Sequence, residues 1–216
     1  MQNILTINNA GYRGERRGQW LLEGINLTVA AGERAAVLGM SGSGKTLLAD
    51  LAAGFQRPAQ GSVTQRGAVA VVTQTFSWYS DLTVAENLDF CCLIHEDDGS
   101  RTEGILAATG LTGWEQTRAA KLPAGYRPML QVACALISQP DLLIMDDPSQ
   151  FLDKQLKTKL TAILEQLAQA GMAILICTGD EELALRCETV YQLANGRVAR
   201  LNIVAPTQGA KEAAAQ

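Results

Sequence analysis

Long apolar runs are absent from this sequence of 216 residues. No stretch approaches the roughly 18 consecutive apolar residues of a membrane-spanning helix. The opening residues, Met1-Gln2-Asn3-Ile4, lack the basic region and the apolar stretch of a signal peptide. The sequence therefore predicts neither a leader nor a transmembrane span. If such a protein works at a membrane, other chains must hold it there.

Clustered positive charge and paired cysteines are also missing. Lysine and arginine total 18 against 22 aspartates and glutamates, and no run of cations occurs. The net charge of −4 therefore argues against nucleic acid as a partner. The five cysteines form an odd set without C-x-x-C spacing, which favours free thiols in a reducing cytosol. The single histidine, His95, lies in a polar stretch and is expected to be solvated.

One glycine-rich stretch carries a specific signal. Gly39-Met40-Ser41-Gly42-Ser43-Gly44-Lys45-Thr46 matches the P-loop pattern G-x-x-x-x-G-K-[ST] at every fixed position. An apolar run, 34–38, precedes it and a good helix former, 46–53, follows, as the motif requires. Glycines let N–H groups curl around phosphates, Lys45 can reach the outer phosphates, and the Thr46 hydroxyl can ligate Mg²⁺. The stretch therefore predicts binding of a nucleoside triphosphate, against the plain alternative of a glycine-rich turn that binds nothing.

The rest of the chain has the patterns of an α/β domain. Hydrophobic residues make up 47% of the sequence, enough for one sizeable domain with a small subdomain. Asn195-Gly196 predicts a type I′ hairpin, and a second short hairpin is expected just before residue 68. Strand patterns occur at 2–9, 20–29, 34–38, 68–72, 141–147 and 172–177. Helical patterns occur at 83–94, 101–138 with breaks, 153–170 and 180–188.

Three features narrow the choice among P-loop proteins. Asp146 follows the apolar run 142–145, the Walker B pattern of a strand that delivers a carboxylate to magnesium. Gln74 lies between the two Walker motifs, and Leu122-Pro123-Ala124-Gly125-Tyr126 stands where a signature motif would precede Asp146. No N-K-x-D motif for guanine recognition occurs. From Tyr12 to the hairpin at 195–196, the chain resembles the ATP-binding subunits of ABC transporters.

This resemblance implies a fold, an activity and partners. The implied fold is an α/β P-loop NTPase of the ABC type, with a mixed-sheet core, an antiparallel β subdomain and an α-helical subdomain. A single domain is expected over residues 1–216, with the helical subdomain at about 83–138 and a flexible tail at about 204–216. The implied activity is hydrolysis of ATP with Mg²⁺. The implied assembly is a homodimer or heterodimer on integral membrane permease subunits, peripheral to the cytoplasmic face of a membrane.

The resemblance also assigns roles to individual residues. Tyr12 matches the aromatic that stacks on adenine, although it is alternatively a surface turn tyrosine. Ser149-Gln150-Phe151-Leu152-Asp153 resembles the segment that crosses the dimer interface. The implied magnesium ligands are Thr46, Gln74 and Asp146, and the implied catalytic residues are Lys45, Gln74 and Asp147. The residues that would meet the partner's ATP are Leu122, Pro123, Ala124 and Gly125. The aromatics beside Gln74 either form a docking groove for a permease helix or cap the subdomain core: Phe76, Trp78 and Tyr79.

Three departures from the family pattern predict impaired hydrolysis. The position of the catalytic glutamate holds Asp147, which is one methylene shorter, and a general base must reach its proton. The position of the switch histidine holds Gly179. In the signature motif, Pro123 offers neither a hydroxyl nor an N–H to a phosphate, although a helix over 125–138 can still aim its N-terminus there. We therefore expect Mg-ATP binding with slow turnover.

Two other functions remain open at this point. One is a non-transport ABC protein, an ATP-gated regulatory dimer for which slow hydrolysis suffices. The other is a catalytically inactive subunit that holds ATP permanently for structure. The sequence names neither a transported substrate nor a direction of transport.

Overall fold

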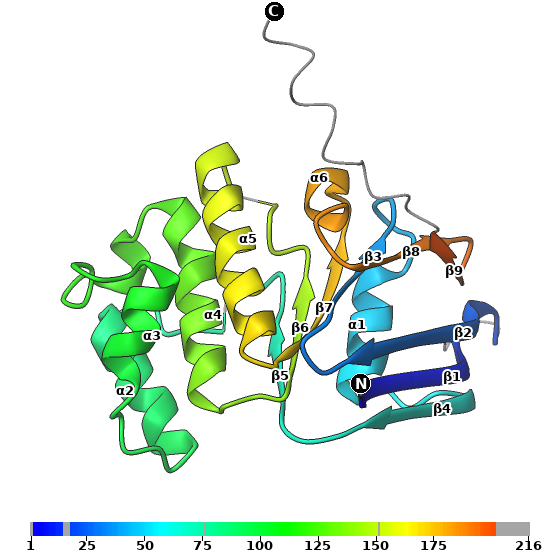
Figure 1. Cartoon of the computed structure of the whole chain (residues 1–216), viewed down its shortest axis with the longest axis horizontal. Helices are drawn as coiled ribbons and strands as arrows, with labels where there is room; N and C mark the ends of the chain where they lie inside the picture. The colour runs from blue at the N-terminus through cyan, green and yellow to red at the C-terminus, as the bar shows by residue number, and fades with distance from the viewer. Residues whose placement is uncertain (1, 15–17, 76, 151, 202–216) are drawn as a thin grey trace, which may run out of the picture.

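A six-stranded mixed sheet forms the centre of the molecule (Figure 1). The computed structural model describes residues 2–14, 18–75, 77–150 and 152–201. The sheet order is β5-β6-β7-β3-β8-β9, and all neighbours are parallel except β8 and β9. Its strands are β5 (Val69–Val72), β6 (Leu142–Asp146), β7 (Ala173–Thr178), β3 (Arg34–Leu38), β8 (Thr189–Ala194) and β9 (Arg197–Leu201). The parallel strands are apolar runs because both of their faces are covered.

A smaller antiparallel sheet lies on the other side of helix α1 (Lys45–Ala53) (Figure 1). Its order is β2-β1-β4, with β1 at Asn3–Arg13, β2 at Trp20–Ala30 and β4 at Gln60–Gln65. Helix α1 buries Leu48 and Leu51 in a core that it shares with Leu5 and Ile25 of this sheet. The helix is therefore fixed between the two sheets, and its N-terminus is held at the end of β3.

Helices α2, α3 and α4 gather at the side of the molecule away from the antiparallel sheet (Figure 1). They span Val84–Ile94, Thr102–Thr109 and Arg127–Ile137, with 3-10 turns at Ala119–Lys121 and Ala124–Tyr126. A capping box begins α2, because Thr83 Oγ1 accepts from the Glu86 N–H and the Glu86 carboxylate accepts from the Thr83 N–H. The remaining described helices are α5 (Lys154–Gln169) and the short helix α6 (Glu181–Ala184).

Several predicted boundaries differ from the structure. The short hairpin expected before residue 68 is wrong, because β4 pairs with the distant strand β1 and β5 joins the other sheet. The helix expected at 180–188 is only four residues long, and the strand expected at 2–9 extends to Arg13 through register shifts in its pairing with β2. The Asn195-Gly196 hairpin is confirmed, with φ of 50° and 73°. The expected tail at 204–216 lies outside the described residues.

Within the described part of the chain, none of the helices combines the length and the apolar character needed to cross a bilayer. The five cysteines are free thiols.

Candidate nucleotide-binding site

The P-loop connects the end of β3 to the first turn of α1, and its glycines are required by its geometry. Gly42 and Gly44 have φ of 78° and 103°, in the left-handed region that favours glycine. A Cβ on Gly39 would overlap the Ser43 side chain and approach the Leu193 carbonyl to 3.0 Å. The Gly39 N–H donates to the Thr178 carbonyl at 3.1 Å, which fixes the start of the loop to the end of β7.

A cavity of about 570 Å³ lies over this loop. Its size falls within the range of ordinary ligand pockets. The described residues that line it are Leu21, Ser41, Gly42, Ser43, Gly44, Lys45, Thr46, Leu47, Asp50, Gln74, Asp147 and Gln150. Most of the predicted P-loop residues thus meet Gln74 and Asp147 in one hollow. Gly39 lies buried behind it, and the Met40 side chain is 82% exposed.

The Lys45 ammonium is folded back into the loop. Its Nζ donates to the Gly39 and Met40 carbonyls at 3.1 and 3.2 Å and lies 3.4 Å from Asp147 Oδ2. The side chain is only 7% exposed. A buried point charge beside the free N–H groups of a helix start is an arrangement suited to a polyphosphate.

The three predicted magnesium ligands lie together. The Thr46 hydroxyl donates to Asp146 Oδ2 at 2.7 Å, and Gln74 Nε2 donates to the same oxygen at 3.0 Å. Asp146 Oδ1 is buried and has no hydrogen-bond partner among the described residues. Burial raises the pKa of the Asp146 carboxyl, and the nearby Asp147 raises it further. A hydroxyl, an orphaned carboxylate oxygen and an amide are the hard oxygen donors that Mg²⁺ prefers, so the residues fit this ion.

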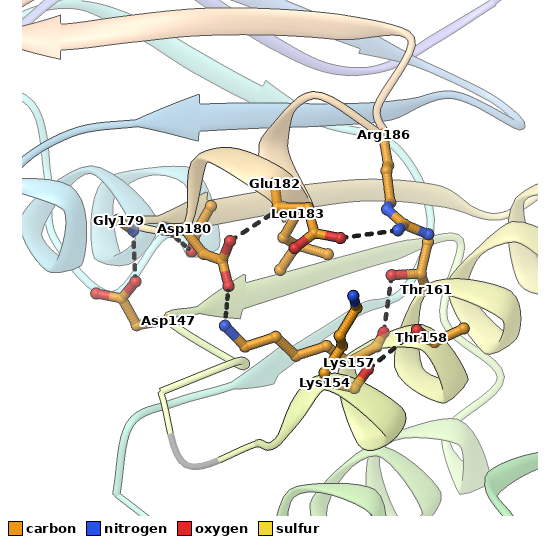
Figure 2. A network of polar contacts seen from close by, with 11 residues as sticks. Asp147, Lys154, Lys157, Thr158, Thr161, Gly179, Asp180, Glu182, Leu183 and Arg186 are labelled. Carbon is orange, nitrogen blue, oxygen red and sulfur yellow. Dashed lines mark hydrogen bonds and ion pairs between the residues drawn. The ribbon is translucent and has the colours of Figure 1, made fainter. Parts of the chain in front are cut away.

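Asp147 occupies an unusual backbone position. Its φ is 47°, in the left-handed region that aspartate tolerates better than most residues, and its N–H donates to the Cys177 carbonyl at 2.7 Å. Asp147 Oδ1 accepts from the backbone N–H of Gly179 at 2.8 Å (Figure 2). The short carboxylate therefore bridges Lys45 and the position where the family has a histidine. Nothing in the sequence marks this contact, because every residue except proline carries a backbone N–H.

The signature segment is placed away from this hollow. Leu122, Pro123, Ala124 and Gly125 are not among the described residues that line the cavity. Gly125 packs so closely that a Cβ would overlap the Leu156 side chain of α5. The helix expected at 125–138 begins as a 3-10 turn, and α4 proper starts at Arg127. Pro128 in the first turn of α4 suits the fixed φ of proline.

Tyr12 is likewise not brought to the cavity. Its hydroxyl donates to Gln56 Oε1 at 3.2 Å, beyond the end of α1, and its ring packs against the core shared by α1 and the antiparallel sheet. Leu21 of the neighbouring strand lines the cavity instead.

The sequence analysis did not predict Asp50, which also lines the cavity. It lies one helical turn after Thr46, and burial raises the pKa of its carboxyl group. The i, i+4 spacing could have indicated it.

A second hollow of about 360 Å³ adjoins the segment after Gln74. The described residues that line it are Ser77, Trp78, Tyr79, Asn87, Phe90, Cys91 and Ile94. The Tyr79 and Phe90 rings meet edge to face at 4.7 Å. Phe76, and Phe151 of the predicted interface segment, lie outside the described residues.

Known proteins are similar to this chain in sequence and in fold. Residues 22–150 match the family model described as ABC transporter. The chain is 34% identical over 190 residues to the taurine import ATP-binding protein TauB of Pelagibacter ubique, covering 80% of this chain and 71% of that protein. It is 31% identical over 209 residues to the lipoprotein-releasing system ATP-binding protein LolD of Chromohalobacter salexigens, covering 87% and 88%.

Solved structures give the same fold. The cbiO1 subunit from Clostridium perfringens, part of the ABC transporter complex cbiONQ, superposes with a TM-score of 0.83 at 23% identity, covering 92% of this chain and 88% of that one. The dimeric ABC transporter cassette MJ0796 superposes with a TM-score of 0.79 at 23% identity, covering 91% and 97%. The predicted fold class is therefore confirmed. With its P-loop, its Walker B strand and these relatives, this chain belongs to the ABC transporter family, as an ATP-binding subunit.

Proposed function

We propose that this subunit binds Mg-ATP in the P-loop cavity and hydrolyses it slowly to drive integral membrane permease partners. The observation that carries the proposal is the meeting of Lys45, Thr46, Gln74 and Asp147 in the lining of one hollow, with the Asp146 carboxylate accepting hydrogen bonds from Thr46 and Gln74. Thr46, Asp146 and Gln74 would hold Mg²⁺, which would neutralise phosphate charge when bound. Lys45 would exchange its carbonyl partners for the outer phosphates.

Slow turnover is inferred from the two residues at the positions that would act on the γ-phosphate, Asp147 and Gly179. Asp147 is shorter than glutamate, and its Oδ1 already accepts from the Gly179 N–H. Gly179 itself has no side chain to offer a γ-phosphate. A displacement of about 1 Å of a reacting group can cost on the order of a hundredfold in rate. The subunit thus still hydrolyses ATP, but at a reduced rate.

The nucleotide sites are proposed to be completed by a second subunit. In one chain the signature residues Leu122 to Gly125 are not part of the cavity that the P-loop lines. A homodimer would carry Asp147, Gly179 and Pro123 in both composite sites. A heterodimer would place Asp147 and Gly179 in one site and Pro123 in the other.

We assign the permease contact to the hollow beside Trp78 and Tyr79. Tyr79 is 53% exposed, and Leu93 and Ile94 at the end of α2 are 76% and 59% exposed. These apolar side chains adjoin the segment that begins at Gln74, so a helix docked there would be linked directly to the magnesium ligands. The subunit would then be peripheral, on the cytoplasmic face of the membrane.

Calorimetric titration with Mg-ATP, followed by a phosphate-release assay, tests this function. We expect binding that Lys45→Ala abolishes, with a low basal rate of phosphate release. Leu201→Ala, on the distant strand β9, serves as the matched control and should leave binding unchanged. A high basal rate that Lys45→Ala removes would contradict slow turnover, and failure to bind Mg-ATP would overturn the whole assignment.

A further inference from the structure

A chain of polar contacts runs from the P-loop to helix α5. Figure 2 shows the part of it that extends from Asp147 to Lys157. Lys45 Nζ lies 3.4 Å from Asp147 Oδ2, and Asp147 Oδ1 accepts from the Gly179 N–H at 2.8 Å. The residue after Gly179 is Asp180, which caps the N-terminus of α6. The position of the Gly179 peptide therefore depends on what holds Asp180.

Several hydrogen bonds hold Asp180. Its N–H donates to Thr178 Oγ1 at 3.0 Å, and its Oδ1 accepts from the Leu183 N–H at 3.2 Å as the cap of α6. Its Oδ2 accepts from Lys157 Nζ at 2.5 Å. The Asp180 side chain is only 14% exposed, so this ion pair is partly shielded from water. Although burial raises the pKa of the Asp180 carboxyl, its contacts with Lys157, Leu183 and Ser149 together hold that pKa below its usual range.

Lys157 approaches from a different element. It lies on α5, one turn after Asp153, the residue whose side chain caps this helix. The Lys157 N–H donates to the Asp153 carbonyl at 2.9 Å, so the lysine is tied to the first turn of α5. Its side chain crosses from α5 to the segment that follows β7 (Figure 2). Lys154, three residues earlier on the same helix, is exposed.

We propose that Lys157 and Asp180 are positioning residues for ATP cleavage: their ion pair orients the Gly179 peptide so that its N–H holds the Asp147 carboxylate at the nucleotide cavity. The proposal rests on the ATPase function proposed above. When phosphates take Lys45, Asp147 Oδ2 loses its cation while Oδ1 stays held by Gly179. Asp147 Oδ2 is then unpaired, while the Gly179 N–H keeps the carboxylate in place through Oδ1, although Gly179 has no side chain.

A purely structural role for the ion pair, as a link between α5 and α6, makes different predictions. It would lower folding stability without changing how well bound ATP is cleaved. The test compares Lys157→Met, Lys157→Arg and the matched control Lys154→Met in the full chain. The readouts are Mg-ATP affinity, kcat and KM for ATP, the unfolding midpoint, and the hydrogen-exchange rate of the Gly179 amide.

We expect Lys157→Met to lower kcat by between about ten- and a hundredfold, the cost of a misplaced reacting group, with KM within about twofold of wild type. Exchange of the Gly179 amide should become faster. Lys157→Arg should restore kcat and the Gly179 exchange rate, because its guanidinium can also donate to Asp180. Lys154→Met should change neither kcat nor the Gly179 exchange rate.

Unchanged kcat and unchanged Gly179 exchange in Lys157→Met would overturn the positioning role. So would a rate loss that Lys157→Arg does not restore, or one that Lys154→Met reproduces. If basal turnover is too slow to measure, Gly179 exchange in the Mg-ATP complex decides alone. Failure of the wild-type protein to bind Mg-ATP would instead overturn the proposed function, so the two failures are distinguishable.

Discussion

Asp147 combines a short side chain with a left-handed backbone. At φ of 47° an ordinary residue is strained by about 1–2 kcal/mol, and aspartate is among those that tolerate this region best. The same carboxylate reaches both the Gly179 N–H and the Lys45 ammonium. The aspartate thus suits its backbone and its two partners, at the cost of the reach that a glutamate would give.

Asp147→Glu should raise kcat about tenfold or more, because the longer side chain extends the carboxylate toward the attacking water. The unfolding free energy should fall by about 1 kcal/mol, because glutamate tolerates the left-handed region less well. Phosphate release and urea unfolding measure the two effects. An unchanged kcat would show that Gly179 or the signature segment, and not the length of the side chain at position 147, limits turnover.

Gly179→His should fold normally and increase turnover. The φ of Gly179 is not in the left-handed region, and a Cβ there would meet only the Gly39 carbonyl at an ordinary 3.5 Å. The imidazole would then stand beside the P-loop and could donate to a γ-phosphate. Phosphate release by Gly179→His and Gly179→Ala separates the imidazole from the added Cβ. Equal rates for the two variants would refute the expectation.

At the scale of elements, helix α4 is fastened to the segment that carries Gln74. Gln131 is 4% exposed, and its Nε2 donates to the Thr73 and Thr75 carbonyls, both at 3.1 Å. One side chain therefore joins the helix that follows the signature segment to the loop that carries Gln74, a proposed magnesium ligand.

Gln131→Met keeps the size of the side chain and removes both hydrogen bonds, although the Thr75 carbonyl still accepts from the Thr73 hydroxyl. The unfolding free energy should fall by about 1–3 kcal/mol, the net contribution of two hydrogen bonds at about 0.5–1.5 kcal/mol each. Urea unfolding measures this loss. Gln155→Met, on the exposed face of α5, is the control and should stay within about 0.5 kcal/mol of wild type. Equal stabilities would show that the two bonds contribute nothing net.

The starts of β3 and β8 are joined by an ion pair. Arg34 Nη2 lies 2.5 Å from Glu188 Oε1, and Glu188 Oε2 accepts from the Arg34 N–H at 2.8 Å. Burial raises the pKa of Glu188, but its bonds from Arg34 and the backbone together lower it below the usual value. The hydrogen bond that Arg34 donates to Glu188 raises the pKa of Arg34, in agreement with a stabilising pair.

Because the folded-state pKa of Glu188 is depressed, its contribution is present above the unfolded pKa and is lost as pH falls through the acid range. Glu188→Gln should therefore reduce the unfolding free energy at neutral pH by no more than about 1 kcal/mol, since the side chain is half exposed. The difference from wild type should disappear at acid pH. Urea unfolding across pH measures it, and a constant difference would contradict the pairing.

At the scale of the whole molecule, the six-stranded sheet separates two cores. One core is built from α2, α4 and α5 against one face of the sheet, and the other from α1 and the antiparallel sheet against the opposite face. The nucleotide cavity lies where the carboxyl ends of the strands meet α1, as expected for open α/β sheets. A ligand there contacts α1 and the segments that follow β5 and β6, and should therefore stabilise the central sheet together with this helix.

Mg-ATP should therefore raise the unfolding temperature of the whole chain in one cooperative step. At about a hundredfold excess over Kd, linkage predicts about 2.7 kcal/mol of added stability. Differential scanning calorimetry with and without Mg-ATP measures it. Lys45→Ala should show no such gain, and Gln155→Met should retain it. A second transition that ignores the nucleotide would contradict a single cooperative unit.

The P-loop residues were predictable because they are contiguous. The glycine positions, Lys45 and Thr46 are fixed by the geometry of one strand-to-helix turn, and the apolar run before Asp146 marks a buried strand. The structure brings Gly42, Gly44, Lys45 and Thr46 into one hollow, and Thr46 donates to Asp146 there. Tyr12 was predicted from a single aromatic in a loop, and the structure directs its hydroxyl to Gln56 instead.

The sequence by itself determined the local features: which stretch forms the P-loop, which strands are buried, and that position 147 holds an aspartate and position 179 a glycine. Only the tertiary structure decided that β4 pairs with β1, that Gly179 donates to Asp147, and that Lys157 holds Asp180. A backbone N–H is the same in every residue except proline, and an ion pair between distant elements has no local pattern. Such contacts exist only once the buried faces of strands and helices have packed.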